Sequence, residues 1–490
     1  MLRNIRITLA VVFYTLITLL FLDFTGTIHT YFGWMADIQF LPALLALNVG
    51  VVVALLVLTF LFGRVYCSVI CPLGVMQDVI AFFGNKSKKN RYSYSPMRKW
   101  LRYSILVVFF AMILAPGVSV IAHLIAPYSA YGRIAQNLFA PVYQGANNVL
   151  AYIAERANSY AFYSVDVWVK SLTTFAVAAI TFVLIAVLAW RGGRTWCNTV
   201  CPVGTILGFF AKYSLYKPVI DTEKCNSCGL CARNCKASCI NSKEHAIDYS
   251  RCVTCFDCIG KCNKGAICYQ LRPIAQSEGK VDESKRKFLS VSALMFAATA
   301  VKAQEQKVDG GLAKILDRKA PNRTVSPKPA GSLSVRHFSD HCTACQLCVS
   351  ACPNQVLVPS SDIEHLMQPE MSFDRGYCRP ECVKCSTVCP TDAIKPITTP
   401  EKSSVSVGYA VWVREKCLVI TDGVTCGNCA KHCPVGAIQM VPEDPDQYGG
   451  LKIPVVNTER CIGCGACEHL CPARPLSAIY IEGREVHKEV

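Results

Sequence analysis

Cysteine is the residue of this sequence with the clearest capacity for chemistry, because its 30 copies recur in runs of fixed spacing. Two runs match the pattern C-x-x-C-x-x-C-x-x-x-C-P: Cys342, Cys345, Cys348 and Cys352, and Cys461, Cys464, Cys467 and Cys471. In this spacing three close thiolates hold one [4Fe–4S] cube, and the fourth thiolate ligates the other cube of a pair. Each run should therefore have a partner elsewhere in the chain.

The partner runs share the Cys-Pro ending. They are Cys378, Cys382, Cys385 and Cys389, with one extra residue in the first gap, and Cys417, Cys426, Cys429 and Cys433, with a longer first gap. Exchanging the fourth ligands predicts four cubes, held by Cys342, Cys345, Cys348 and Cys389; by Cys378, Cys382, Cys385 and Cys352; by Cys461, Cys464, Cys467 and Cys433; and by Cys417, Cys426, Cys429 and Cys471. Structural zinc uses two pairs of ligands and disulfides need no such spacing, so the pattern favours clusters.

A second region carries two runs without the final proline, since Lys236 and Asn263 stand in its place. The same exchange predicts two more cubes, held by Cys225, Cys228, Cys231 and Cys262, and by Cys252, Cys255, Cys258 and Cys235. Cys239 and Cys268 are then left over. They are either alternative ligands or small buried thiols, the more common fate of unassigned cysteines.

The last four cysteines belong to an internal repeat. Residues 63–74 and 193–204 both read G-R-x-aromatic-C-x-x-x-C-P-x-G and contain Cys67, Cys71, Cys197 and Cys201. A separation of four residues predicts that both thiols of a repeat lie on one helix face. Four thiolates could close a seventh cube at the membrane surface, and the alternatives are a dithiol relay or a purely structural turn.

Composition excludes several classes of protein. With 52% hydrophobic and only 17% charged residues, the chain is neither disordered nor an ordinary soluble protein. Its 490 residues are too many for a small disulfide-stapled scaffold, and no C-x-x-C-H motif for haem attachment occurs. The net charge of +16 is concentrated in places such as residues 64–99, between two apolar runs, so it indicates membrane topology and no nucleic-acid partner.

Four apolar runs should position the repeat as membrane spans: residues 7–22, 40–62, 101–122 and 171–190. The alternative, buried helices of a soluble core, fits poorly because the runs lack an amphipathic stripe. Lys and Arg fall before the first run, between the second and third, and after the fourth, which places both ends of this unit in the cytoplasm. Residues 127–169 should then lie outside as interfacial helices.

A fifth apolar run, residues 288–301, has the length of a signal-peptide core. It is preceded by Ser-Lys-Arg-Lys-Phe-Leu at residues 284–289, which is similar to a twin-arginine export signal, and followed by a small-residue cleavage-like site at 301–303. Export of the following domain is the prediction, and the alternative is a short buried helix in a single cytoplasmic domain. Residues 304–339, rich in Pro, Gly and Ser, should form a linker or a wrap-around arm.

The two C-x-x-x-C-P motifs on a four-span unit, followed by a two-cluster segment, resemble the membrane polyferredoxin (NapH type) of periplasmic nitrate reductase systems. The chain from Ser284 onward is similar to the exported four-cluster partner (NapG type), so the whole resembles a fusion of the two. The resemblance implies a quinol dehydrogenase subunit in the bacterial inner membrane, with electrons passed to a periplasmic acceptor. The residues after Cys235 and Cys262 depart from the family pattern.

The expected architecture is an α-helical membrane domain with α+β bacterial dicluster ferredoxin-like domains. Its parts are a membrane domain at 1–212, a cytoplasmic two-cluster domain at 213–283, a signal or anchor at 284–303, a linker at 304–339 and a periplasmic four-cluster domain at 340–490.

From the residues alone, the prediction is an electron-transfer protein between the quinone pool, or a cytoplasmic donor, and a periplasmic redox partner. The rival function is an accessory factor that supplies electrons to mature a periplasmic metalloenzyme. No motif marks a quinone pocket; His29, Asp37 and His123 are candidates for proton transfer, although interface anchoring explains them as well.

Overall fold

The first and fourth apolar runs of the sequence form the two longest helices of the computed structural model, α1 (Leu2–Leu22) and α12 (Leu172–Gly192). The structure describes residues 1–23, 25–87, 92–114, 119–159, 161–271, 318–443 and 450–490. At 1.5 Å per residue each helix is about 31 Å long, enough to cross a membrane. Only 28% and 22% of their most apolar stretches are buried, so they are surface helices rather than the core of a soluble domain.

The predicted span over residues 40–62 is wrong as a single helix, because the chain forms α4 (Phe40–Leu45) and α5 (Val49–Phe62). The turn between them has Leu47 at φ 53°, and the Asn48 side chain caps α5 by accepting from the amide of Val51. The Phe40 amide donates to the Tyr66 hydroxyl, whereas a continuous helix would separate these residues by about 39 Å. The chain therefore reverses direction between α4 and α5.

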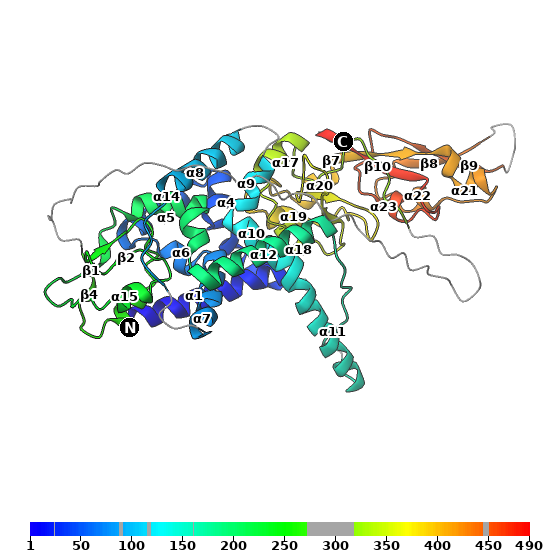
Figure 1. The fold of residues 1–490 in the computed structure, drawn as a ribbon. Helices are drawn as coiled ribbons and strands as arrows, with labels where there is room; N and C mark the ends of the chain where they lie inside the picture. The colour runs from blue at the N-terminus through cyan, green and yellow to red at the C-terminus, as the bar shows by residue number, and fades with distance from the viewer. Residues whose placement is uncertain (24, 88–91, 115–118, 160, 272–317, 444–449) are drawn as a thin grey trace, which may run out of the picture.

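The run over residues 101–122 contains α8 (Lys99–Leu114) and α9 (Ser119–Ile125), and residues 115–118 between them lie outside the described residues. Shorter helices complete the bundle: α2 (Thr27–Phe32), α3 (Trp34–Asp37), α6 (Val65–Val69), α7 (Pro72–Ser87), α10 (Pro127–Ile134), the π-helical turn η1 (Ala135–Phe139), α11 (Ala140–Arg156), α13 (Thr195–Thr199) and α14 (Pro202–Ala211). Every residue of α10 is buried, so the prediction of interfacial helices is wrong for this segment. Helix α11 projects away from the bundle (Figure 1).

The first cysteine-rich domain lies at the end of the bundle where α1 begins (Figure 1). Strand β1 (Tyr216–Ile220) pairs antiparallel with β4 (Ile267–Leu271), with Tyr216 opposite Leu271. Between them come β2 (Ile240–Asn241), β3 (Ala246–Ile247) and the short helices α15 (Leu230–Arg233) and α16 (Asp257–Lys261).

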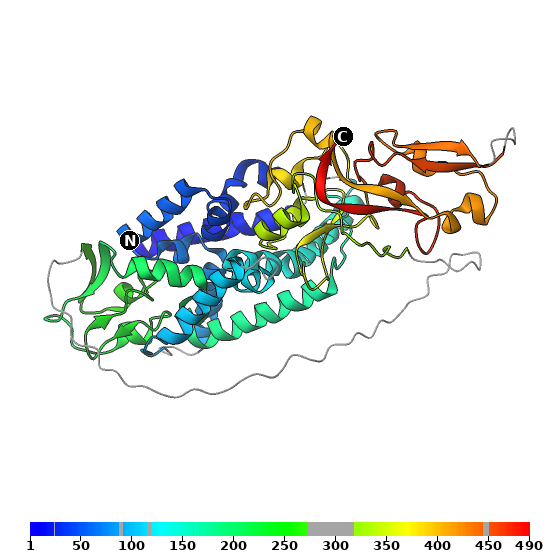
Figure 2. The same cartoon turned by 90° about the horizontal axis from the view of Figure 1, so that it is seen from above.

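The second cysteine-rich domain lies at the opposite end of the bundle (Figures 1 and 2). Three antiparallel pairs frame it: β5 (Leu357–Pro359) with β6 (Pro369–Met371), β7 (Val405–Trp412) with β10 (Ile479–Glu489), and β8 (Ile438–Pro442) with β9 (Lys452–Val456). Its helical turns are α17 (Val335–His341), α18 (Leu347–Ala351), α19 (Lys384–Thr387), α20 (Thr399–Ser403), η2 (Arg414–Lys416), α21 (Leu418–Thr421), α22 (Asn428–Lys431) and α23 (Ala466–His469).

Residues 318–334 follow this second domain closely, as a wrap-around arm does. The Lys319 amide donates to the Pro475 carbonyl, and Arg323 forms an ion pair with the buried Glu468. The signal-like segment, 284–303, lies outside the described residues.

Candidate metal centres

The four cysteines of the internal repeat come together inside the helical bundle, and all four are buried. The Cys201 thiol interacts electrostatically with the thiols of Cys197, Cys71 and Cys67, so the two repeats meet at one site. The expectation of one helix face is wrong: Cys67 lies in α6, and Cys71 lies between α6 and α7. Proline after Cys71 lacks an N–H and disfavours a helical conformation in the residue before it, so a new helix begins there.

The arginine of each repeat reaches across to the cysteine of the other repeat. Arg194 Nη1 donates to the carbonyl oxygen of Cys67 at 2.7 Å, and Arg64 Nη2 donates to that of Cys197 at 3.4 Å. The last glycine of each motif makes room for this arrangement. A Cβ atom on Gly74 would lie 2.4 Å from the Cys67 oxygen and 2.6 Å from Arg194. The residues that the two repeats share, from the Arg to the final Gly, therefore pack together as a single unit.

The donor set and its surroundings fit an iron–sulfur cluster. Four thiolates around a [4Fe–4S] core carry a net negative charge, and thiolate is the ligand type such clusters use. Arg64 and Arg194 are both 0% exposed and both lie within hydrogen-bonding reach of a cysteine sulfur. Arg194 pairs with Asp78, but Arg64 forms no ion pair with a carboxylate of the described residues, and the four ligands would supply the negative charge that its burial requires.

Alanine at Gly74 should disrupt this site. Its methyl group would overlap the Cys67 carbonyl and the Arg194 guanidinium, and overpacking of this kind typically costs about 1–3 kcal/mol. We expect a lower unfolding temperature and loss of iron from the purified protein. The matched control is Gly145→Ala in α11, where nothing lies within 4 Å of the added atom, and which should leave both measurements unchanged. Equal behaviour of the two variants would contradict the packing described.

A buried network of charges joins this site to the first cysteine-rich domain. Asp78 in α7 forms ion pairs with Arg194 at 2.6 Å, Lys236 at 2.9 Å and Arg6 at 3.0 Å. Burial alone would raise the pKa of Asp78, but these cations hold it well below its usual range. Lys236 also pairs with Asp257 at 3.1 Å. Lys236, which stands where the cluster motif usually has proline, therefore links the first cysteine-rich domain to the bundle.

The predicted ligands of the first domain gather as two groups. Cys235 interacts electrostatically with Cys258 and Cys255, and Cys258 also interacts with Cys252. Cys239, left over in the sequence, lies beside this group, with its sulfur 3.6 Å from that of Cys235. Its hydrogen bond lowers the pKa of the Cys235 thiol and favours the thiolate.

The other group of this domain combines Cys231, in α15, with Cys225 and Cys228, with which it interacts electrostatically. Cys262 ends α16, and α16 packs against α15. Cys268 is exposed on β4, and its sulfur lies 3.7 Å from the Gly265 carbonyl oxygen.

The second domain brings together the four predicted crossed sets. Cys348 interacts with Cys342, Cys345 and Cys389; Cys385 with Cys378, Cys352 and Cys382; Cys464 with Cys461 and Cys433, beside Cys467; and Cys429 with Cys426, Cys471 and Cys417. Burial raises the pKa of Cys345 and Cys429 to about 11 and that of Cys464 to about 12. As free thiols they would stay protonated near neutral pH, so a bound metal must displace their protons.

Four of the runs share one backbone conformation, a feature that the spacing alone does not reveal. In each, the second and fourth residues after the first cysteine have positive φ: Ser227 and Gly229, Thr254 and Phe256, Ala344 and Gln346, Gly463 and Gly465. Such a conformation costs a non-glycine residue about 1–2 kcal/mol. Its recurrence therefore indicates that the four loops fold around groups of the same kind. The two runs of the first domain adopt it despite lacking the final proline.

Comparison with known proteins bears on the internal repeat and on the second cysteine-rich domain. Family models for a 4Fe–4S binding domain match residues 44–90 and 174–220, and models for a 4Fe–4S dicluster domain match residues 341–393 and 424–474. The methylamine utilization ferredoxin-type protein MauM of Methylophilus methylotrophus is 32% identical over 162 residues, which are 32% of this chain and 71% of that protein. The chain belongs to the ferredoxin-type 4Fe–4S electron-transfer family.

Other members of this ferredoxin-type family match different parts of the chain. The ferredoxin-type protein NapF of Escherichia coli K12 is 27% identical over 175 residues, covering 36% of this chain and 98% of NapF. The putative electron transport protein YccM of the same strain is 25% identical over 228 residues, covering 45% and 55% of the two chains. No solved structure matches. These matches confirm the predicted dicluster ferredoxin-like domains and the electron-transfer role. They do not confirm the more specific prediction of a fusion of NapH and NapG types.

Proposed function

We propose that this ferredoxin-type protein spans the bacterial inner membrane and passes electrons between the quinone pool and a periplasmic redox partner through a chain of [4Fe–4S] clusters. Six clusters would occupy the ferredoxin runs, and a seventh would occupy the site formed by the internal repeat. The clusters, when bound, supply one-electron redox chemistry.

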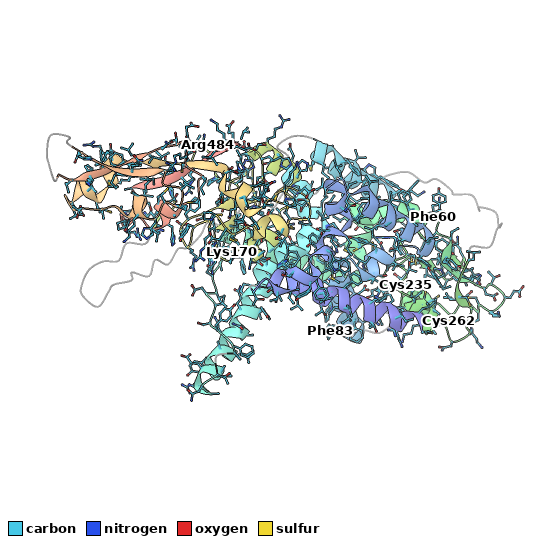
Figure 3. The ribbon with its side chains drawn as sticks, turned by 180° about the vertical axis from the view of Figure 1, so that it is seen from behind. Phe60, Phe83, Lys170, Cys235, Cys262 and Arg484 are labelled. Atoms are coloured by element: carbon cyan, nitrogen blue, oxygen red, sulfur yellow. The ribbon has the colours of Figure 1, made fainter. Side chains whose placement is uncertain are left out.

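One observation carries this proposal: the two cysteine-rich domains lie at opposite ends of the helical bundle (Figures 1 and 3), and the bundle itself contains a third cysteine site, formed by the internal repeat. On one side the repeat contacts the first domain directly, since the Arg194 amide donates to the Lys236 carbonyl at 2.7 Å. On the other side α10 packs against α7, and Gly132 of α10 abuts the Cys345 carbonyl of the second domain. The arrangement forms a continuous route along the bundle.

The exposed surface of the bundle is apolar, which favours contact with lipid. Large apolar side chains are exposed on helices α1, α5, α8 and α12, and include Val11, Val53, Val107, Ile180 and Val183 at 49–67% exposure. Soluble proteins rarely expose apolar surface on such a scale, whereas lipid-facing helices do.

The described chain leaves the first cysteine-rich domain at Leu271 and resumes at Arg318 beside the second one, so a bundle that spans a membrane requires a passage across it between these two residues. If the bundle spans a membrane, the apolar run at 288–301 is the stretch suited to that passage or to export through it. Both alternatives place the second cysteine-rich domain on the periplasmic side.

Burial and positive charge around the cysteines would suit the sites to electron transfer. Burial of the cysteines excludes water from the sites, and the Arg64 and Arg194 guanidinium groups offset the negative charge of the central one. Positive charge and N–H donors near a cluster stabilise its reduced form, so these residues favour electron entry into the centre of the bundle.

Topology can be tested directly by reporter fusions. A periplasm-dependent reporter after Val490 should be active, and the same reporter after Leu271 should be inactive, because the two domains would occupy different compartments. Replacing Lys285 and Arg286 by Gln should trap the final domain inside and abolish the first signal. Equal reporter activity at both positions would contradict the two-compartment arrangement.

A reduction assay tests the electron-transfer role. Quinol added to the purified, cluster-loaded protein should reduce the clusters, as seen by loss of visible absorbance and by EPR, and a soluble oxidant should then reoxidise them over many turnovers. A single turnover without catalysis would favour an accessory factor that supplies electrons for metalloenzyme maturation.

A further inference from the structure

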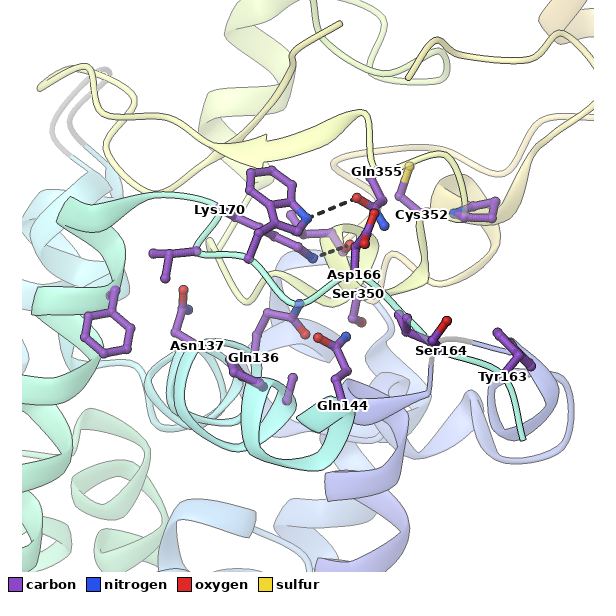
Figure 4. A pocket seen from close by; sticks show the side chains of 18 residues that line it. Gln136, Asn137, Gln144, Tyr163, Ser164, Asp166, Lys170, Ser350, Cys352 and Gln355 are labelled. Carbon is purple, nitrogen blue, oxygen red and sulfur yellow. Dashed lines mark hydrogen bonds between the residues drawn. The ribbon is translucent and has the colours of Figure 1, made fainter. Parts of the chain in front are cut away.

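A cavity of about 320 Å³ lies where the helical bundle meets the second cysteine-rich domain. One wall is formed by η1 and the start of α11, and the opposite wall by the chain around Cys352 (Figure 4). The loop that leads into α12 closes the space between the two walls. Cys352 is a predicted ligand of the cluster that also uses Cys378, Cys382 and Cys385, so the cavity adjoins an electron-transfer site.

The interior of this cavity is polar and rich in hydrogen-bond donors. Lys170 Nζ donates to the Val349 carbonyl oxygen at 3.2 Å and, with the Gln136 amide oriented to satisfy both of its ends, lies 2.8 Å from the Gln136 oxygen. Among the ion pairs of the described residues none involves Lys170, so its charge faces the cavity without a carboxylate partner. Trp168 donates to Gln355 at 3.0 Å and fixes the loop to the second domain.

The rim of the cavity is apolar and exposed. Val169 borders the opening at 54% exposure, and Val142, on the first turn of the projecting helix α11, is 72% exposed. Since α11 projects across the axis of the bundle at the end opposite the first domain, it would lie along the outer membrane surface (Figure 1). A ligand with a polar head and an apolar tail fits such a combination of interior and rim.

We propose that this cavity binds the head group of a quinol and is the point where electrons enter the cluster chain. The inference rests on the proposed function for its substrate class, and adds the location. Lys170 Nζ, held by the Val349 carbonyl and the Gln136 oxygen, would donate its remaining N–H to one oxygen of the head group, with the tail leaving past Val169 and α11. Electrons would then enter the cluster chain beside Cys352, at the junction of the bundle and the second domain.

The chemistry balances with the groups present. Oxidation of one quinol breaks two O–H bonds, gives one quinone, and passes one electron to each of two oxidised [4Fe–4S] clusters. The two protons leave toward the outer solvent, and Asp166, which lines the cavity and is exposed, can relay them. The periplasmic partner protein is the oxidant that returns the clusters to their starting state.

The other large cavity, of about 360 Å³ between α1 and α7, is less suited to this role. Its charged lining residues are Arg3, Arg6, Asp78, Lys236 and Asp257, and each of these forms an ion pair with another member of the set. Such a closed network leaves few donors for a ligand.

Photolabelling and kinetics on the full, cluster-loaded chain test the inference. An azidoquinone should label peptides from residues 136–144, 163–170 or 349–355, and excess unlabelled quinone, but not phosphatidylglycerol, should prevent labelling. Lys170→Met should raise the apparent KM for a soluble quinol at least tenfold and reduce labelling to a similar degree, while Lys170→Arg should restore much of both. Iron content and reduction by dithionite should stay unchanged.

Two control variants separate the explanations. Lys328→Met removes another buried lysine of the second domain, one that does not line the cavity, and quinone labelling should stay at the parental level. Val79→Trp fills the cavity between α1 and α7 and should also have no effect on quinol oxidation.

Labelling near Val79, a parental KM in Lys170→Met, or protection by phosphatidylglycerol would overturn the location while leaving the proposed function in place. Failure of quinol to reduce the clusters of the parent protein at all would instead overturn the proposed function and the inference together.

Discussion

Cys67→Ala and Cys197→Ala should produce the same defect, although the two residues lie in different repeats of the helical bundle. Their thiols meet at one buried site, so removing either leaves an incomplete ligand set. We expect the parent protein to contain about 28 iron atoms, and each variant to lose about four or to hold a three-iron form of the cube. Electron flow between the bundle and the first domain should slow in both.

Iron analysis, EPR and quinol turnover on the two variants distinguish the alternatives. A dithiol relay predicts unchanged iron with lost turnover, and a structural turn predicts unchanged iron with a loss of roughly 1 kcal/mol in stability. Cys268→Ala is the matched control, because Cys268 is exposed and lies outside the predicted ligand sets. About 24 iron atoms in the parent protein, unaltered in both variants, would contradict the shared site, and fewer than about 16 would contradict the six predicted pairings.

Asp78→Asn should be among the most damaging single substitutions outside the cysteines. The carboxylate pairs with Arg6, Arg194 and Lys236, and its loss leaves buried cations without their main counter-charge. Removing one partner of a buried ion pair typically costs about 3–5 kcal/mol. We expect a strongly lowered unfolding temperature and easier release of the first cysteine-rich domain in limited proteolysis.

The matched control for this prediction is Asp221→Asn. Asp221 also pairs with a lysine, Lys224, at 3.0 Å, but both side chains are exposed, so solvent already screens the interaction. That variant should unfold like the parent protein. If Asp78→Asn and Asp221→Asn shift the unfolding temperature equally, the network does not hold the domain on the bundle.

The cysteine groups could be predicted from the sequence because their ligands sit within short loops. Where three cysteines occur within seven residues, as from Cys342 to Cys348, local geometry alone determines which thiols converge. The positive φ values of these loops could not be predicted from the sequence, because residues such as Phe256 and Gln346 rarely adopt that conformation.

The path of the apolar segments was harder to predict because it depends on contacts distant in the sequence. Residues 40–62 are continuous in hydropathy, yet the chain turns at Leu47 so that Phe40 can meet Tyr66. Hydrophobic length shows that a segment prefers an apolar environment, but not whether it crosses that environment or doubles back. The role of Lys236 was equally hidden, although the missing proline marked the position as unusual.

The exchange of arginines between the two repeats has the form of an isologous contact. Arg194 of the second repeat donates to the Cys67 carbonyl of the first, and Arg64 of the first donates to the Cys197 carbonyl of the second. Such reciprocal contacts are found in a two-fold symmetric dimer, here with both subunits joined into one polypeptide. Neither half contains a finished site by itself. A substitution of Arg64 or Arg194 should therefore disturb the cysteine contributed by the opposite half. The site can be completed only after the second half has been synthesised.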